Sequence, residues 1–213
     1  MLKRILYPFI LFIIVINCKA QDQFKPSTYI GINAGVNISR VAFTPHIDQN
    51  PLTSISGGLV FRHLSEPHIG LQIELNYAGK GWIENLDTLG SYKRSLQVYE
   101  IPMLAVFIAG SKVFRFSFTL GPYVSWLKDE KETISVDKPY YKAYYEQPLE
   151  VKWEFGFTGG LGFEFHTRIG AFGLRALYSN SLNNLFSLNA STFYFNASRN
   201  QVLNAGFTYF IKL

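Results

Sequence analysis

The sequence has little cysteine, few charged residues and no long apolar run beyond its first twenty residues. Cys18 is the only cysteine among 213 residues, so no disulfide can form within the chain. Charged residues account for 16% of the sequence, against roughly 25% in typical soluble domains. Because a membrane-spanning helix needs about 20 consecutive apolar residues, helical spans are excluded downstream of residue 20.

Sequence motifs of the common enzyme classes are absent as well. There is no nucleophile elbow, no HExxH zinc motif, no phosphate-binding loop and no acidic calcium repeat. The chain contains four histidines, His46, His63, His68 and His166. Their spacing fits no regular metal site. We therefore expect no catalysis, no cofactor and no bound metal.

The first twenty residues have the layout of a secretory signal peptide. Lys3 and Arg4 form a basic start, and an apolar segment of 12 residues follows at 5–16. Cys18 and Ala20 place small residues where a signal peptidase cleaves, so we expect cleavage after Ala20.

This interpretation divides the chain into a signal peptide at 1–20 and one mature domain at 21–213. Two alternatives stay open. A retained anchor would need a longer apolar segment, and a lipoprotein acylated at Cys18 would have Asn17 as an unsuitable neighbour. Cleavage would remove three basic residues and no acidic one, which leaves 17 basic and 15 acidic residues. Without a basic cluster, we expect no nucleic-acid partner.

Apolar and polar residues alternate along several segments of the mature chain, as they do in β-strands whose two faces meet different environments. In residues 69–77 the apolar side chains fall on one face, and Gly70, Gln72, Glu74 and Asn76 fall on the other. The same period occurs in 30–38, 153–165 and 203–213. The polar faces carry mainly Gly, Asn, Ser and isolated charges, which suits a narrow wet interior. The outer face of a soluble sandwich would instead carry many Lys, Glu and Thr residues.

These segments predict an all-β protein, an eight-stranded antiparallel transmembrane β-barrel with up-and-down topology. We expect strands at about 29–39, 54–62, 68–78, 95–108, 113–126, 151–165, 172–180 and 202–212. Most of them reach the roughly 9–11 residues that a tilted strand needs to cross a bilayer. In hydrocarbon an open sheet edge would leave backbone groups unpaired, so the sheet is expected to close.

The connections alternate between short turns and long segments. The turns lie at 63–67, 109–112 and 167–171, and the long segments lie at 40–53, 79–94, 127–150 and 181–201. Outer-membrane barrels place short turns in the periplasm and long loops outside, so both termini are expected in the periplasm. The longest segment contains Tyr140, Tyr141, Tyr144 and Tyr145. We expect these tyrosines to form a partner-facing surface.

Six charged side chains fall on the inward face of the predicted barrel: Arg62, Glu74, Arg115, Glu154, Glu164 and Arg175. A charge in a low-dielectric interior needs a partner or water, so we predict an ion-pair cluster that fills the lumen. Glu164 and Arg175 lie at similar distances from the turn near Ile169, and Arg115 begins the neighbouring strand. We therefore predict that Glu164 sits between Arg115 and Arg175. A selectivity ring in a pore is the alternative, although eight strands leave an interior about wide enough for side chains alone.

Five stretches carry a family resemblance: GLQIEL at 70–75, YEIPML at 99–104, LGPYVS at 120–125, GGLGFE at 159–164 and LYSNSLNN at 177–184. In this order and spacing they resemble the PorT-like outer-membrane β-barrel family over essentially the whole mature chain. The resemblance implies an eight-stranded barrel in a Gram-negative outer membrane. The namesake member assists type IX protein secretion, and most relatives have no assigned role. The chain departs from many outer-membrane barrels in ending on Leu213 instead of an aromatic residue.

The sequence therefore favours a non-enzymatic integral protein of the bacterial outer membrane that is structural or accessory to a secretion or surface assembly. Its expected partners are outer-membrane lipid and the proteins of such an assembly. A narrow porin-like transport barrel is the alternative. A third hypothesis is a lipid A-modifying barrel enzyme, in which His46 would work with Ser39 or Ser54 near the outer rim.

Overall fold

The computed structural model describes residues 24–86, 90–136, 144–145, 149, 151–186 and 195–213. The predicted signal peptide and the tyrosines at 140 and 141 lie outside the described residues. No α-helix in the described part of the chain is long and apolar enough to span a bilayer.

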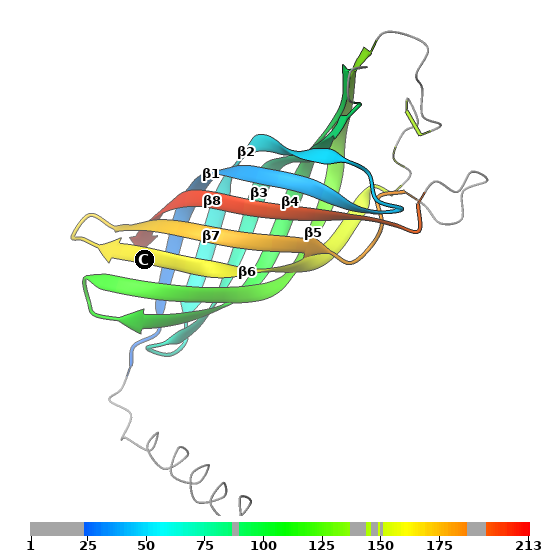
Figure 1. The fold of residues 1–213 in the computed structure, drawn as a ribbon. Helices are drawn as coiled ribbons and strands as arrows, with labels where there is room; N and C mark the ends of the chain where they lie inside the picture. Colours follow the sequence, from blue (N-terminus) through cyan, green and yellow to red (C-terminus); the bar gives the residue numbers. More distant parts are fainter. Residues whose placement is uncertain (1–23, 87–89, 137–143, 146–148, 150, 187–194) are drawn as a thin grey trace, which may run out of the picture.

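Eight antiparallel strands form a closed barrel in which each strand pairs with its neighbours in the sequence and β1 pairs with β8 (Figure 1). The strands are β1 (Ser27–Thr44), β2 (Gln49–Leu64), β3 (Ile69–Asn85), β4 (Gly90–Gly110), β5 (Phe114–Val136), β6 (Trp153–His166), β7 (Ala171–Ser181) and β8 (Ala197–Lys212). This confirms the predicted fold class. Closure pairs the edges that an open sheet would leave unsatisfied in hydrocarbon.

The two faces of the barrel wall follow the alternation of the sequence. On β3, Leu71 and Ile73 are exposed on the outside, whereas Gln72 and Glu74 are buried inside. The outward residues of the other strands are equally apolar and together form a continuous belt for acyl chains.

A row of aromatic side chains marks one edge of the belt. Tyr77, Tyr99, Trp126 and Trp153 are successive cross-strand neighbours on β3, β4, β5 and β6. Their ring centroids lie 5.5, 6.2 and 6.5 Å apart. Aromatic rings of this kind sit at the headgroup level of a membrane, so this row marks where the strands leave the hydrocarbon.

The short turns lie at 65–68, 111–113 and 167–170, at the same end of the barrel as both ends of the described sheet. In outer-membrane barrels this end faces the periplasm. Gly170 closes the turn between β6 and β7 with a φ of +145°, a conformation that costs a residue with a Cβ atom more than it costs glycine.

Three of the predicted long segments contain more strand than expected: most of 40–53, most of 79–94, and residues 127–136 within 127–150. β3 extends to Asn85 and β4 begins at Gly90, and the ladder between them still pairs Asn85 with Ser91. Figure 1 shows these strands and β5 projecting beyond the rest of the barrel. The alternation fails in this part because residues 78–82 are all buried, and Gly79 and Gly81 present no side chain outward.

Candidate functional site

The interior of the barrel is filled by charged and polar side chains at three levels, and an aromatic cluster covers its extracellular end. Of the charged residues predicted to point inward, Arg62, Glu74, Glu154 and Glu164 are buried, and Arg115 and Arg175 are partly buried. They do not form one cluster.

The level nearest the periplasm is built around Glu164. One carboxylate oxygen of Glu164 accepts from Arg62 at 2.6 Å, and the other lies 3.1 Å from Nε2 of His166. The Arg62 guanidinium also lies 4.1 Å from the ring centroid of Phe210, and its Nε donates to Gln72 at 2.7 Å. The buried pair is thus completed by further hydrogen bonds and a cation–π contact, which offset part of its desolvation cost.

The predicted partners of Glu164 are wrong. Arg175 forms its ion pair with Glu74, and Arg115 forms no ion pair with any described residue, although it lies opposite Glu164 across the β5–β6 ladder. The pairing of neighbouring strands predicts only contacts between residues that lie side by side in the barrel wall. Arg62 lies on β2, which is not a neighbour of β6, the strand that carries Glu164. The Arg62 side chain therefore reaches Glu164 across the lumen.

The middle level is built around Glu74. Besides Arg175, its carboxylate accepts hydrogen bonds from Gln72 at 2.6 Å, Asn76 at 2.8 Å and Asn33 at 3.3 Å. The amide of Gln72 therefore bridges Glu74 and Arg62, which links the middle level to the periplasmic level.

The upper level is built around Lys80, a fully buried lysine in the segment 79–94, for which the sequence predicts a loop. Its Nζ lies 2.5 Å from Glu100 and 2.9 Å from Glu154. Glu154 also accepts from the hydroxyl of Tyr123 at 2.7 Å and from the amide of Asn200. Glu100 could have been found from the sequence, because it alternates with the outward-facing Tyr99 and Ile101.

Glycines in the barrel wall leave space for these side chains, and the cavities that remain between the side chains are small. A Cβ atom at Gly156 would lie 2.5 Å from the ring of Tyr123. Between the ion pairs are two cavities of about 20 and 30 Å³, sizes that suit single water molecules. The described interior is therefore packed.

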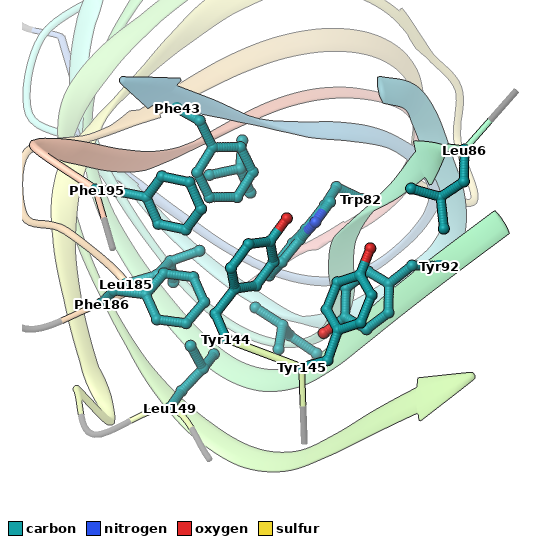
Figure 2. Packing of buried hydrophobic residues seen from close by; sticks show 12 residues of the cluster. Phe43, Trp82, Leu86, Tyr92, Tyr144, Tyr145, Leu149, Leu185, Phe186 and Phe195 are labelled. Atoms are coloured by element: carbon teal, nitrogen blue, oxygen red, sulfur yellow. The ribbon is translucent and has the colours of Figure 1, made fainter. Parts of the chain in front are cut away.

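The aromatic cap covers the extracellular end (Figure 2). It consists of Val41, Phe43, Trp82, Leu86, Tyr92, Leu96, Tyr144, Tyr145, Leu149, Leu185, Phe186 and Phe195, all of which are buried. Its residues come from β1, β3 and β4 and from the connections that follow β3, β5 and β7. The rings of Tyr92 and Tyr145 stack with centroids 3.9 Å apart, and those of Phe43 and Phe195 lie 4.5 Å apart.

A buried carboxylate holds the cap in place. Glu84 accepts hydrogen bonds from Trp82 Nε1 at 2.9 Å, from the Tyr144 hydroxyl at 2.7 and 2.8 Å and from the Tyr145 hydroxyl at 3.1 Å. Burial, and next the adjacent Glu84 carboxylate, raise the pKa of Tyr144. Its hydroxyl therefore stays protonated, and remains a donor, at physiological pH.

This position overturns the predicted role of two loop tyrosines. Tyr144 and Tyr145 were expected to face a partner, but both are buried in the cap. A signal for the cap was present in the sequence, because Leu185, Phe186 and Phe195 make the connection after β7 unusually apolar for a loop.

The serine and histidine residues of the enzymatic hypothesis are not assembled. Ser39 donates to the backbone carbonyls of Leu52 and Gly81, and Ser54 donates to the carbonyl of Gly79. His46 is exposed and forms no hydrogen bond with a described residue. The described residues also contain no group of three or more His, Cys, Asp or Glu that could hold a metal ion.

A family model agrees with the barrel. The family described as "Outer membrane protein beta-barrel domain" matches residues 20–187. Among solved structures, OprG from Pseudomonas aeruginosa is 14% identical over 87% of this chain and 95% of that chain, with a TM-score of 0.49. Ail from Yersinia pestis is 14% identical over 86% of this chain and 99% of that chain, with a TM-score of 0.44. No curated protein matches.

Proposed function

We propose that this chain, which belongs to the outer membrane protein beta-barrel domain family, is a sealed membrane scaffold without catalysis of its own. In the bacterial outer membrane it would be structural or accessory to a secretion or surface assembly. The resemblance to PorT-like proteins supports the secretion role within this proposal.

The packed interior is the observation that carries the proposal. Ion pairs and hydrogen bonds fill the lumen at three levels, and the aromatic cap covers its outer end. A solute would have to break these pairs to pass, and the cavities between them suit only single water molecules. A scaffold therefore fits the interior better than a narrow transport barrel does.

The extended strands offer the surface through which such a scaffold could work. We call the parts of β3, β4 and β5 beyond the aromatic row, residues 78–85, 90–98 and 127–136, the blade. Its ladder is paired to the tip, where Gly90 lies opposite Val136. Lys93 and Thr133 are exposed on it. The Arg94 guanidinium pairs with Glu130 at 3.0 Å and Glu132 at 3.1 Å, which ties β4 to β5 inside the blade.

Site-specific photo-crosslinking in intact cells tests this role. A photoreactive residue at Lys93 or Thr133 is expected to capture a discrete protein partner. The matched control is Phe118, which faces outward within the apolar belt, where the same residue should capture lipid. Blade positions that yield no protein adduct, under conditions where Phe118 yields lipid adducts, would contradict the accessory role.

A further inference from the structure

The periplasmic mouth of the barrel contains a hollow of about 550 Å³ that the filled lumen does not use. The rings of Tyr29 and Phe210 line it together with His166. Tyr29 and Phe210 are both buried, and their ring centroids are 6.5 Å apart. Four cationic side chains also line it: Lys112, Arg115, Arg168 and Lys212.

The charge of this hollow is unbalanced. No Asp or Glu from the described part of the chain lines it, and none of its four cationic side chains forms an ion pair with a described residue. Glu164, which contacts His166 in the lining, already pairs with Arg62. In contrast, the cations inside the lumen are paired, because Arg62, Lys80 and Arg175 each form an ion pair with a carboxylate. A concave surface with several unpaired cations attracts and orients an anion.

The residues at the rim of the hollow indicate which class of anion it would bind. Two turns at its rim place an exposed apolar residue directly after a cation: Val113 follows Lys112, and Ile169 follows Arg168. Val113 is 44% and Ile169 is 72% exposed. A cation beside an exposed apolar side chain suits the boundary between headgroups and acyl chains, where the apolar part is buried and the charge meets phosphate. A water-soluble acidic peptide would leave the apolar side chains of Val113 and Ile169 exposed to water.

We propose that this periplasmic mouth binds the phosphate headgroup of an anionic phospholipid from the inner leaflet of the outer membrane. Arg115 approaches the headgroup from the barrel wall on β5, and Arg168 and Lys212 approach it from the rim. Basic pockets at a membrane surface recognise anionic headgroups in this way. The opposite part of the rim lacks this charge, because the turn between β2 and β3 carries Glu66.

Native mass spectrometry of the full-length mature protein in detergent tests the site. The lipid probes are phosphatidylglycerol and the zwitterionic phosphatidylethanolamine, and the soluble competitors are inorganic phosphate and an oligoglutamate peptide. The wild type is expected to retain phosphatidylglycerol in preference to each of the other three. The double variant Arg115→Gln/Arg168→Gln should bind phosphatidylglycerol roughly 25-fold more weakly, at about fivefold for each cation removed. The control variant Lys93→Gln/Lys131→Gln removes two exposed cations from the blade and should bind like the wild type.

Three results would overturn the proposal. Equal loss in both double variants would show attraction to net charge alone. Equal retention of phosphatidylethanolamine would exclude recognition of a net anionic headgroup. Displacement of phosphatidylglycerol by an equal concentration of inorganic phosphate, or by an oligoglutamate peptide, would assign the mouth to a soluble anion. Retention of heat-modifiable migration on gels shows that each variant is folded, so a loss of binding reports on the site.

Discussion

Replacing Glu164 by Gln tests the pairing inside the lumen, because sequence and structure assign this carboxylate to different partners. In the folded barrel Glu164 is 3% exposed and lies 2.6 Å from Arg62. The Glu164→Gln variant keeps the shape of the side chain but leaves the Arg62 guanidinium buried without a carboxylate. Removal of one partner of a buried pair costs about 3–5 kcal/mol of unfolding free energy.

A double-mutant cycle separates the two assignments. Combining Glu164→Gln with Arg62→Met removes both charges, so the pair should show a coupling of at least about 2 kcal/mol. Combining Glu164→Gln with Arg175→Gln should give a coupling below about 1 kcal/mol, because Arg175 pairs with Glu74. Arg115→Gln, which breaks no described ion pair, should change stability by no more than about 0.5 kcal/mol.

The assay is equilibrium unfolding in urea from lipid vesicles, followed by tryptophan fluorescence, to which Trp126 and Trp153 at the aromatic row and Trp82 in the cap contribute. Strong coupling of Glu164 to Arg175, with none to Arg62, would refute the lumen geometry. A cost near the roughly 0–1 kcal/mol of exposed pairs for Glu164→Gln would show that the site is solvated.

Three further predictions concern the apolar belt, the aromatic cap and the signal peptide. Ile73→Arg, in the middle of the apolar belt, should lower the free energy of unfolding by about 2–4 kcal/mol, whereas Ile83→Arg, on the same strand beyond the aromatic row, should lower it by about 0–1 kcal/mol. Equal losses in vesicle unfolding would contradict the placement of the belt. Tyr144→Phe removes one hydrogen-bond donor to the buried Glu84 and should lower the free energy of local opening of the cap by about 1–3 kcal/mol. Hydrogen exchange in the cap should become faster while the transmembrane strands stay protected. Unchanged exchange in the cap would contradict this prediction. Mass spectrometry should find Gln21 at the mature N-terminus, and an acylated cysteine there would show a lipoprotein instead.

In the strands that cross the membrane, the sequence predicted which side of the wall the alternating residues face, because the period of a strand fixes alternate faces whatever the fold around it. That is why the outward positions of β3 and the inward position of Glu74 agree with the structure. It could not predict which residues meet across the lumen. The partner of Glu164 depends on the tilt and stagger of the closed barrel, which bring in Arg62 from β2.

The outer end was the least predictable part. Lys80 and Glu84 lie in a stretch with no clean alternation, since Gly79 and Gly81 interrupt the outward face, and for such a stretch the sequence predicts a loop. The sequence predicts a surface position for Tyr144, because this residue lies in a long connection rich in charged residues and tyrosine. Its burial depends on contacts with Phe186 and Phe195 from another connection, and such pairing is not encoded locally.

Single-channel recording in a planar bilayer tests most directly whether the barrel is closed. Reconstituted wild-type protein, shown to be folded by heat-modifiable migration, is expected to give no discrete conductance steps, because ion pairs block the lumen at three levels and the aromatic cap covers it. Stable, reproducible conductance steps from the folded wild type would contradict the sealed scaffold and favour a transport barrel.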